Sequence, residues 1–148
     1  MKSLSSAKRA LLIGSALFCV DRFTKISSLY FFSDRPITLI PNVVQLSLYL
    51  HTKFAISADH EVLAVVGGAL FVILCIGTVF FLRGKNSSEQ LWIALLAAGA
   101  TSNLLDTIRY GGIIDWIEIP RLTFFNLADV LIISGCVGLL FSLFRKKT

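Results

Sequence analysis

Long apolar runs alternate with short polar stretches along this chain of 148 residues. The apolar runs occupy approximately residues 10–32, 62–82, 90–106 and 124–144. Residues 62–82 carry no charged side chain, and a helix of that length reaches roughly 31 Å, enough to cross the apolar core of a bilayer. The third run is shorter and rich in Ala, Gly and Ser, which suits close packing of helices. The pattern predicts a single all-α membrane domain, residues 1–148, with four transmembrane helices.

A second periodicity lies in the two stretches expected outside the membrane, residues 33–61 and 107–123. From Val44 to His51 apolar and polar residues alternate, and a period of two predicts a strand with one apolar face. In the later stretch, Gly111 and Gly112 form a turn signal before a β-rich piece that Pro120 interrupts. We therefore expect a small β element, a sheet resting on the membrane surface.

The charges refine this picture. The net charge is +5, and 55% of the residues are hydrophobic. The basic residues cluster before the first run, between the second and third runs, and after the fourth: Lys2, Lys8, Arg9; Arg83, Lys85; Arg145, Lys146, Lys147. Four crossings would put these clusters on one side, as the positive-inside rule requires. We expect both termini in the cytoplasm and no nucleic-acid partner.

The cysteines and the N-terminal run exclude other classes. Cys19, Cys75 and Cys136 each lie in apolar sequence without a CxxC or other metal-ligand spacing, so no metal site and no disulfide framework is expected. The first run resembles a signal peptide in composition, but Phe18 precedes Cys19 where a lipoprotein signal has a small residue. We expect the run to be retained as the first membrane helix.

Ionisable residues inside apolar runs need a reason, because charge is expensive in lipid. The candidates are Asp21, Lys25, Asp106, Asp115 and Asp129. With both termini inside, all of them fall near the outer face of the membrane. Asp21 and Lys25 are four residues apart, so they share a helix face. They form either an ion pair that neutralises itself or a support for a functional site.

Asp115 and Asp129 are the sharper pair. Two facing carboxylates cannot both ionise cheaply, so one keeps a proton and the other can take one from a bridging water. An aspartic protease uses such a pair of carboxyl groups to activate a water molecule as the nucleophile. The alternative is that each acid simply lies at a helix terminus. The negative charge of Asp129 would be favourable near the start of its helix. Asn103 and Asn126 lie at the same level and either hold a carboxylate or a substrate carbonyl, or simply cap and pack.

Four motifs in this order resemble the lipoprotein signal peptidase family, also called signal peptidase II. "DRFTK" looks like the family's D-x-x-T-K motif, "SNLLD" its G-N-x-x-D motif and "GGIIDW" its G-x-x-x-D-F stretch. "FFNLADVLIISG" is similar to F-N-x-A-D-x-x-I-x-x-G, the most specific of the four. The resemblance covers nearly the whole chain. It implies four transmembrane helices carrying an extracytoplasmic β-cradle.

The resemblance also implies an activity. The catalytic dyad falls on Asp115 and Asp129, and positions that support the dyad or contact substrate fall on Asn103, Asn126, Asp106, Asp21 and Lys25, with His51 and Arg109 as further candidates for these roles. The implied reaction is hydrolysis of a prolipoprotein just before its diacylglyceryl-modified cysteine, without metal or cofactor. The implied location is the bacterial plasma (inner) membrane, as a multi-pass protein in contact with membrane lipid, with the site near the outer face. No oligomer is implied.

The chain departs from the family pattern at several positions. Thr107 stands where the family usually has Arg after the Asp of its G-N-x-x-D motif, and Arg109 is a candidate substitute. Ser102 stands where Gly usually precedes the Asn. The family's N-x-G-x-A-F motif in the cradle corresponds to "HTKFAIS" here, so His51 replaces Asn and Lys53 replaces Gly, which adds bulk and charge near the substrate path. Two alternatives therefore stay open: an impaired or re-specialised paralogue that binds lipoprotein precursors, and a small membrane transporter component.

Overall fold

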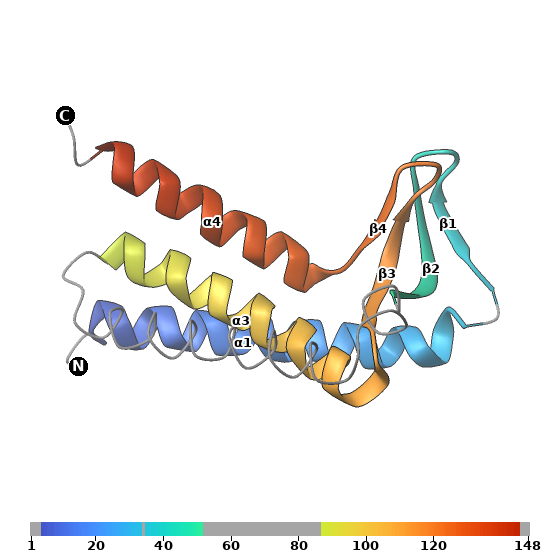
Figure 1. Ribbon diagram of the computed structural model, residues 1–148, viewed down its shortest axis with the longest axis horizontal. Coiled ribbons are helices and arrows are strands. Elements are labelled where there is room, and N and C mark those ends of the chain that lie inside the picture. The colour runs from blue at the N-terminus through green and yellow to red at the C-terminus, as the bar shows by residue number, and fades with distance from the viewer. Residues whose placement is uncertain (1–3, 34, 52–86, 146–148) are drawn as a thin grey trace.

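Three long helices and one sheet make up the described part of the chain, residues 4–33, 35–51 and 87–145, in a computed structural model. The helices are α1 (Ser6–Phe31), α3 (Ser87–Tyr110) and α4 (Leu127–Arg145). The strands are β1 (Ile37–Ile40), β2 (Val44–His51), β3 (Ile113–Ile119) and β4 (Thr123–Phe125). Figure 1 shows the helices running lengthwise with the sheet at one end, while α1 begins and α4 ends at the other. The expected helix 62–82 and Lys53 lie outside the described residues.

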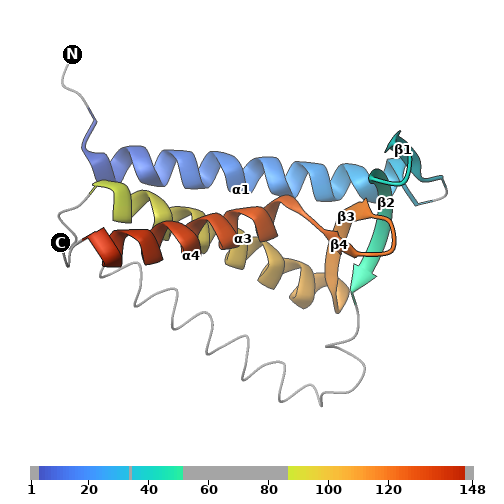
Figure 2. The ribbon, with the colours of Figure 1, turned by 90° about the horizontal axis from the view of Figure 1, so that it is seen from above.

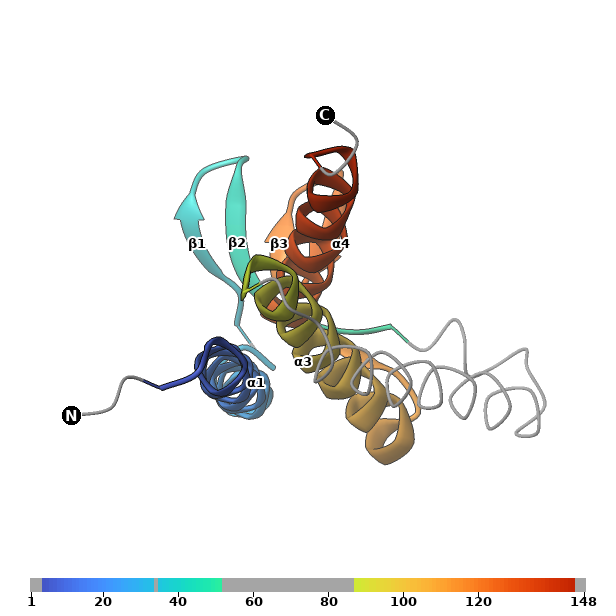
Figure 3. The same cartoon turned by 90° about the vertical axis from the view of Figure 1, so that its left-hand side faces the viewer.

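Helix α3 is the centre of the bundle, because it packs against both α1 and α4, which barely touch each other (Figure 3). Small residues make the close approach possible. A methyl group added at Gly99 would overlap the carbonyl oxygen of Ala128 on α4, and one added at Gly135 would lie 2.7 Å from the carbonyl oxygen of Trp92. The Ala- and Gly-rich run in the sequence is therefore the surface on which α4 packs.

The burial pattern along α1 is the reverse of that in a soluble protein. Its buried residues include Asp21, Lys25 and Ser28, all with no exposed surface, while Phe23 and Tyr30 are more than 70% exposed. The buried positions recur every three or four residues and so share one helix face. Apolar side chains outside and charges inside are the arrangement that a lipid environment favours.

The sheet is antiparallel throughout, in the order β1-β2-β3-β4 (Figure 2). The strand predicted from the alternation is confirmed as β2. Its partner β3 pairs Tyr49 with Asp115 and His51 with Ile113. Pro120 does not break a strand but lies in the turn from β3 to β4, where Arg121 takes a positive φ of 67°.

Two helix boundaries differ from the expected ranges for physical reasons. Helix α3 continues past residue 106 to Tyr110, because its polar side chains are paired inside the bundle, and it ends at Gly111, whose φ of 69° suits glycine. The fourth apolar run begins as strand β4, and its helix starts only after Asn126. Among the described residues, α3 is long and apolar enough to cross a membrane, and Leu127–Ser142 is a shorter apolar helix.

Candidate active site

The start of α4 organises the candidate site. Asn126 occupies the N-cap position: its side-chain oxygen accepts from the backbone N–H of Asp129 at 3.0 Å. In return, the backbone N–H of Asn126 donates to Asp129 Oδ2 at 3.2 Å. This reciprocal arrangement is a capping box with an acid at the third helical position. The sequence N-L-A-D thus folds locally into a turn that fixes the Asp129 carboxylate.

The same asparagine holds the second acid. Asn126 Nδ2 donates to Asp115 Oδ1 at 2.7 Å and also lies 3.2 Å from the carbonyl oxygen of Ile114. Asp115 is only 4% exposed, and it enters from β3, on the sheet. Two aspartates from different elements are therefore bound to one residue, Asn126.

A third partner reaches Asp115 from the neighbouring strand. Since His51 pairs with Ile113 and Tyr49 with Asp115, the His51 and Asp115 side chains are diagonal neighbours on one face of the sheet. His51 Nδ1 lies 2.7 Å from Asp115 Oδ2. The ring of Tyr49 meets the imidazole edge to face, with centroids 4.7 Å apart, and stacks on Phe124. The histidine is thus held in place on two sides.

Asn103 on α3 connects Asp129 to a buried cation. Its Nδ2 donates to Asp129 Oδ1 at 2.8 Å, and its Oδ1 accepts from Lys25 Nζ at 2.6 Å. Because one end of the amide is fixed as an acceptor by the lysine, the other end must present donors to the carboxylate. Both oxygens of Asp129 are therefore occupied by hydrogen-bond donors, from Asn103 and from Asn126.

Behind the amide lies a cluster of balanced charges. Lys25 Nζ lies 2.7 Å from Asp106 Oδ2 and 3.2 Å from Asp21 Oδ2. Arg22 pairs with Asp106 as well. Asp21 also accepts from Ser102 Oγ at 2.5 Å and from the backbone N–H of Ala128, at the start of α4, at 2.8 Å. Two acids and two bases cancel in net charge, which a buried cluster requires.

The electrostatics of Asp115 follow from its position in the sheet. Burial raises the pKa of its carboxyl above the usual value of 3.8, and the nearby charge of Asp129 acts in the same direction. Hydrogen bonds from His51 and Asn126 oppose the rise in pKa without cancelling it. The negative charge of Asp129 favours the protonated form of Asp115, because a second ionised carboxylate at one site is disfavoured.

The residues singled out from the sequence largely converge here. Asp21, Lys25, Asn103, Asp106, Asp115, Asn126, Asp129 and His51 form one continuous set of polar contacts. The predicted contact between Asp21 and Lys25 is confirmed, but the pair does not simply neutralise itself, since Lys25 is closer to Asp106. Arg109 lies 5.3 Å over the ring of Tyr110, and no contact described here joins it to the set.

Sequence reasoning missed Arg22, which takes the position beside Asp106 that was considered for Arg109. Its guanidinium contacts the carbonyl and hydroxyl oxygens of Ser102, at 3.2 and 3.3 Å, as well as Asp106. Two signals were available: Arg22 is itself a charge within an apolar run, and Thr107 left Asp106 without an adjacent cation. Residue 22 reaches Asp106 only because α1 and α3 lie side by side.

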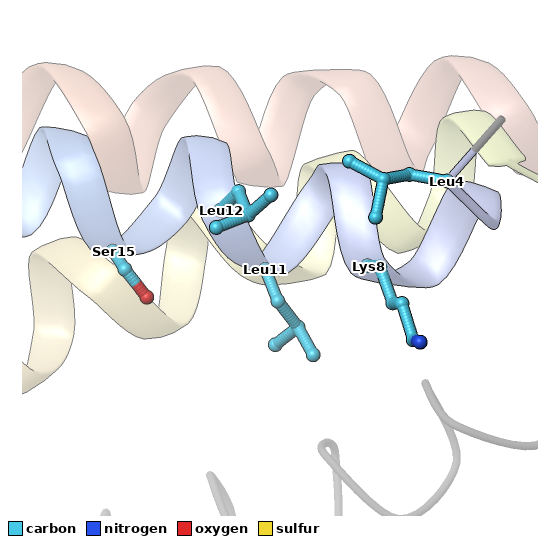
Figure 4. A pocket seen from close by; sticks show the side chains of 5 residues that line it. All are labelled: Leu4, Lys8, Leu11, Leu12 and Ser15. Atoms are coloured by element: carbon cyan, nitrogen blue, oxygen red, sulfur yellow. The ribbon is translucent and has the colours of Figure 1, made fainter. Parts of the chain in front are cut away.

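A separate hollow on α1 is remote from this chemistry. It is lined by Leu4, Lys8, Leu11, Leu12 and Ser15, near the start of the helix (Figure 4). The buried charges of α1 lie on its second half, towards the sheet. The hollow therefore takes no part in the candidate site.

Comparisons with known proteins agree with this architecture. The sequence profile of the family described as signal peptidase (SPase) II matches residues 13–145. A lipoprotein signal peptidase of Caldicellulosiruptor bescii is 27% identical over 87% of this chain and 86% of its own length. Another, from Microcystis aeruginosa, is 30% identical over 92% of this chain and 90% of its own. A solved bacterial membrane enzyme has a TM-score of 0.81 at 21% identity, covering 95% of this chain and 90% of that one.

The chain is mostly helical, carries a small antiparallel sheet and shares its fold with that solved bacterial membrane enzyme. Its class is that of the peptidases, since the matching relatives are named as such. More narrowly, the chain belongs to the signal peptidase II family, an aspartic-peptidase family of hydrolases.

Proposed function

We propose that this protein is an aspartic endopeptidase that removes the signal peptide from diacylglyceryl-modified prolipoproteins, cutting just before the lipidated cysteine. The relatives' name supplies the lipoprotein substrate. The observation that carries the proposal is the meeting of Asp115 and Asp129 on Asn126, at the sheet end of the bundle. Asn103, Lys25, Asp21 and Asp106 act behind this pair as its support.

The proposed chemistry uses one water and one shared proton. One carboxylate of the pair takes a proton from the water molecule, and the oxygen of that water attacks the scissile carbonyl carbon. The other, protonated, acid gives its proton to the carbonyl oxygen. When the tetrahedral intermediate collapses, the C–N bond breaks and the protonated acid gives its proton to the amine nitrogen. A hydroxyl of the intermediate returns its proton to the other carboxylate as the carbonyl forms, so the pair again holds a single shared proton. No covalent intermediate and no metal enters these steps.

The proposed setting is the bacterial plasma membrane, crossed four times, with both termini in the cytoplasm. Large apolar side chains on the helices are exposed, among them Phe23, Phe141 and Phe144, as lipid contact favours. The start of α1 and the end of α4 carry basic residues and lie opposite the sheet. The carboxylates then lie near the outer face, where a diacylglyceryl cysteine anchored in the bilayer presents its peptide bond.

The transporter alternative fits the geometry less well. Proton or ion relays thread acids through the membrane, whereas Asp21, Asp106, Asp115 and Asp129 here gather at one end of the bundle. A binding protein without peptidase activity would have the same geometry and would differ only in not cleaving the substrate.

The test is cleavage of a diacylglyceryl-modified reporter by the purified full-length protein in lipid. Asp115→Asn and Asp129→Asn should each lower kcat by roughly 10²–10⁴-fold, since either change removes one member of the acid–base pair. Glu118→Gln is the matched control on the same strand: its partner is Ser47, at 2.6 Å, and the amide keeps that hydrogen bond. Wild-type protein that inserts but leaves the reporter uncut would overturn the peptidase proposal.

A further inference from the structure

The contact between His51 and Asp115 is the feature that the proposed reaction does not yet use. Nδ1 and Oδ2 are 2.7 Å apart, so one hydrogen must lie between them, because two bare acceptors would repel at that distance. Asp115 Oδ1 is already occupied by the amide of Asn126. With a partner on each oxygen, His51 and Asn126 together fix the rotation of the Asp115 carboxyl group about its Cβ–Cγ bond.

Exposure distinguishes this partner from the others. The side chain of His51 is 35% exposed, whereas that of Asp115 is 5% exposed. Asn126, the other partner of Asp115, has no exposed surface. His51 is thus the contact through which Asp115 meets the solvent-facing rim of the site, at the end of β2.

Other charges around the pair come from three further elements. Asp129 of α4 acts on Asp115 directly. Lys25 of α1 and Asp106 of α3 lie one amide further away, behind Asn103. On β2 itself, Tyr49 meets the imidazole through its ring. Among the described groups, His51 is the titratable partner in direct hydrogen-bond contact with Asp115.

We propose that His51 is a positioning residue for the carboxyl pair: its Nδ1 holds Asp115 Oδ2 from the rim of the site, so that the orientation of Asp115 and the pH range of cleavage depend on the imidazole. The inference rests on the proposed function. It deepens that function by assigning a role to the sheet, since β2 supplies the histidine and β3 the acid. The geometry of the carboxyl pair then depends on how β2 pairs with β3.

A pair of isosteric substitutions tests the role of Nδ1 specifically. Asparagine places its amide nitrogen where Nδ1 of histidine lies, whereas glutamine places it near Nε2. His51→Asn should therefore keep kcat within about threefold of wild type, while His51→Gln and His51→Ala should lower kcat about tenfold with little change in KM. The readout is the pH profile of reporter cleavage by the full-length protein in lipid.

The pH profile separates positioning from a merely structural role. Without a donor on Oδ2, the proton of Asp115 is harder to remove, so the acidic limb in His51→Gln and His51→Ala should move up by about one pH unit, a tenfold change in the equilibrium. In His51→Asn the limb should stay near its wild-type position. Melting temperatures of the three variants report whether each still folds.

Each outcome decides something. If all three variants match wild type, or if all lose activity equally with the acidic limb unmoved, the positioning role is wrong while the peptidase stands. If His51→Gln rescues as well as His51→Asn, the role of Nδ1 is wrong. If wild-type protein cleaves nothing, the peptidase proposal fails first, and the role of His51 falls with it.

Discussion

Asp115 shows how one residue can serve a site at the expense of stability. Its carboxyl group is almost fully buried, and burial raises its pKa because the charged form loses water. His51 and Asn126 return part of that loss through hydrogen bonds. Functional sites commonly retain groups that lower the stability of the fold, because the function needs them. Replacing the acid with its neutral isostere should therefore stabilise the fold.

Asp115→Asn is predicted to raise the melting temperature at neutral pH. The folded-state pKa of Asp115 lies above the unfolded value near 3.8, so the wild-type group costs nothing below that value and costs stability as pH rises through the folded pKa. The gap between variant and wild type should open as pH rises from about 3.8 towards neutrality. The asparagine oxygen still accepts from Asn126, and the His51 tautomer can reverse to accept from the new amide.

The measurement is thermal unfolding in detergent across that pH range, with Glu118→Gln as the control whose melting curve should follow wild type at every pH. A variant that is less stable than wild type at neutral pH would show that the hydrogen bonds of Asp115 outweigh its burial.

At the scale of elements, the N-terminus of α4 concentrates the site. Its first turn is capped by Asn126, its N–H at Ala128 donates to Asp21, and its third residue is Asp129. Negative charge near a helix N-terminus is favourable. The helix start therefore draws carboxylates from α1 and from α4 itself to one place, and the position of α4 against α3 decides where they meet.

Gly99→Ala is predicted to disturb that position. The new methyl group would overlap the carbonyl oxygen of Ala128 and approach Ile132 Cγ1 to 2.9 Å, so α4 must shift. Overpacking of this kind costs about 1–3 kcal/mol, more than the roughly 1 kcal/mol that alanine gains over glycine within a helix. The first turn of α4 moves with it, so cleavage should fall more than the loss of stability alone explains.

Gly14→Ala is the matched control, since its methyl group would meet Ala94 on α3 at 3.0–3.2 Å, in the first half of α1 and away from the buried charges of its second half. We expect a change in unfolding free energy near zero and unchanged kcat. Equal effects of the two substitutions, measured by unfolding and by reporter cleavage, would contradict a special role for the contact between α3 and α4.

The whole molecule is polarised along its length. Buried charges and the sheet lie at one end, and the start of α1 and the end of α4 lie at the other (Figure 1). Apolar side chains cover the outside of the described helices. We predict from this layout that the protein lies in a bilayer with the sheet at one face and the basic ends at the other.

Single-cysteine labelling tests the orientation. In a background without the native cysteines, Val43→Cys and Leu122→Cys place thiols in the two exposed hairpin turns, and Thr148→Cys places one at the C-terminus. A membrane-impermeant maleimide should label positions 43 and 122 in spheroplasts and position 148 only after lysis. The reverse pattern would turn the site towards the cytoplasm and contradict the proposed substrate.

Much of this layout could be predicted from local pattern. The alternation of residues 44–51 predicted β2, and the spacing of Asp21 and Lys25 predicted their contact. The polar residues within apolar runs predicted most members of the contact set, while Asp115 and His51 lie in the stretches expected outside the membrane. Arg22 escaped because its partner, Asp106, lies 84 residues away and across a helix interface. The hydrogen bond between His51 and Asp115 could not be predicted either, because it depends on the register of β2 against β3.

The sequence by itself determined the elements and which side chains had to avoid lipid, because hydropathy and periodicity act over a few neighbouring residues. Only the tertiary structure decided which of those side chains meet. Asn126 binds Asp115 and Asp129 together because a helix start, a strand and a sheet register coincide. Such coincidence arises from packing between segments far apart in the chain, which no local pattern records.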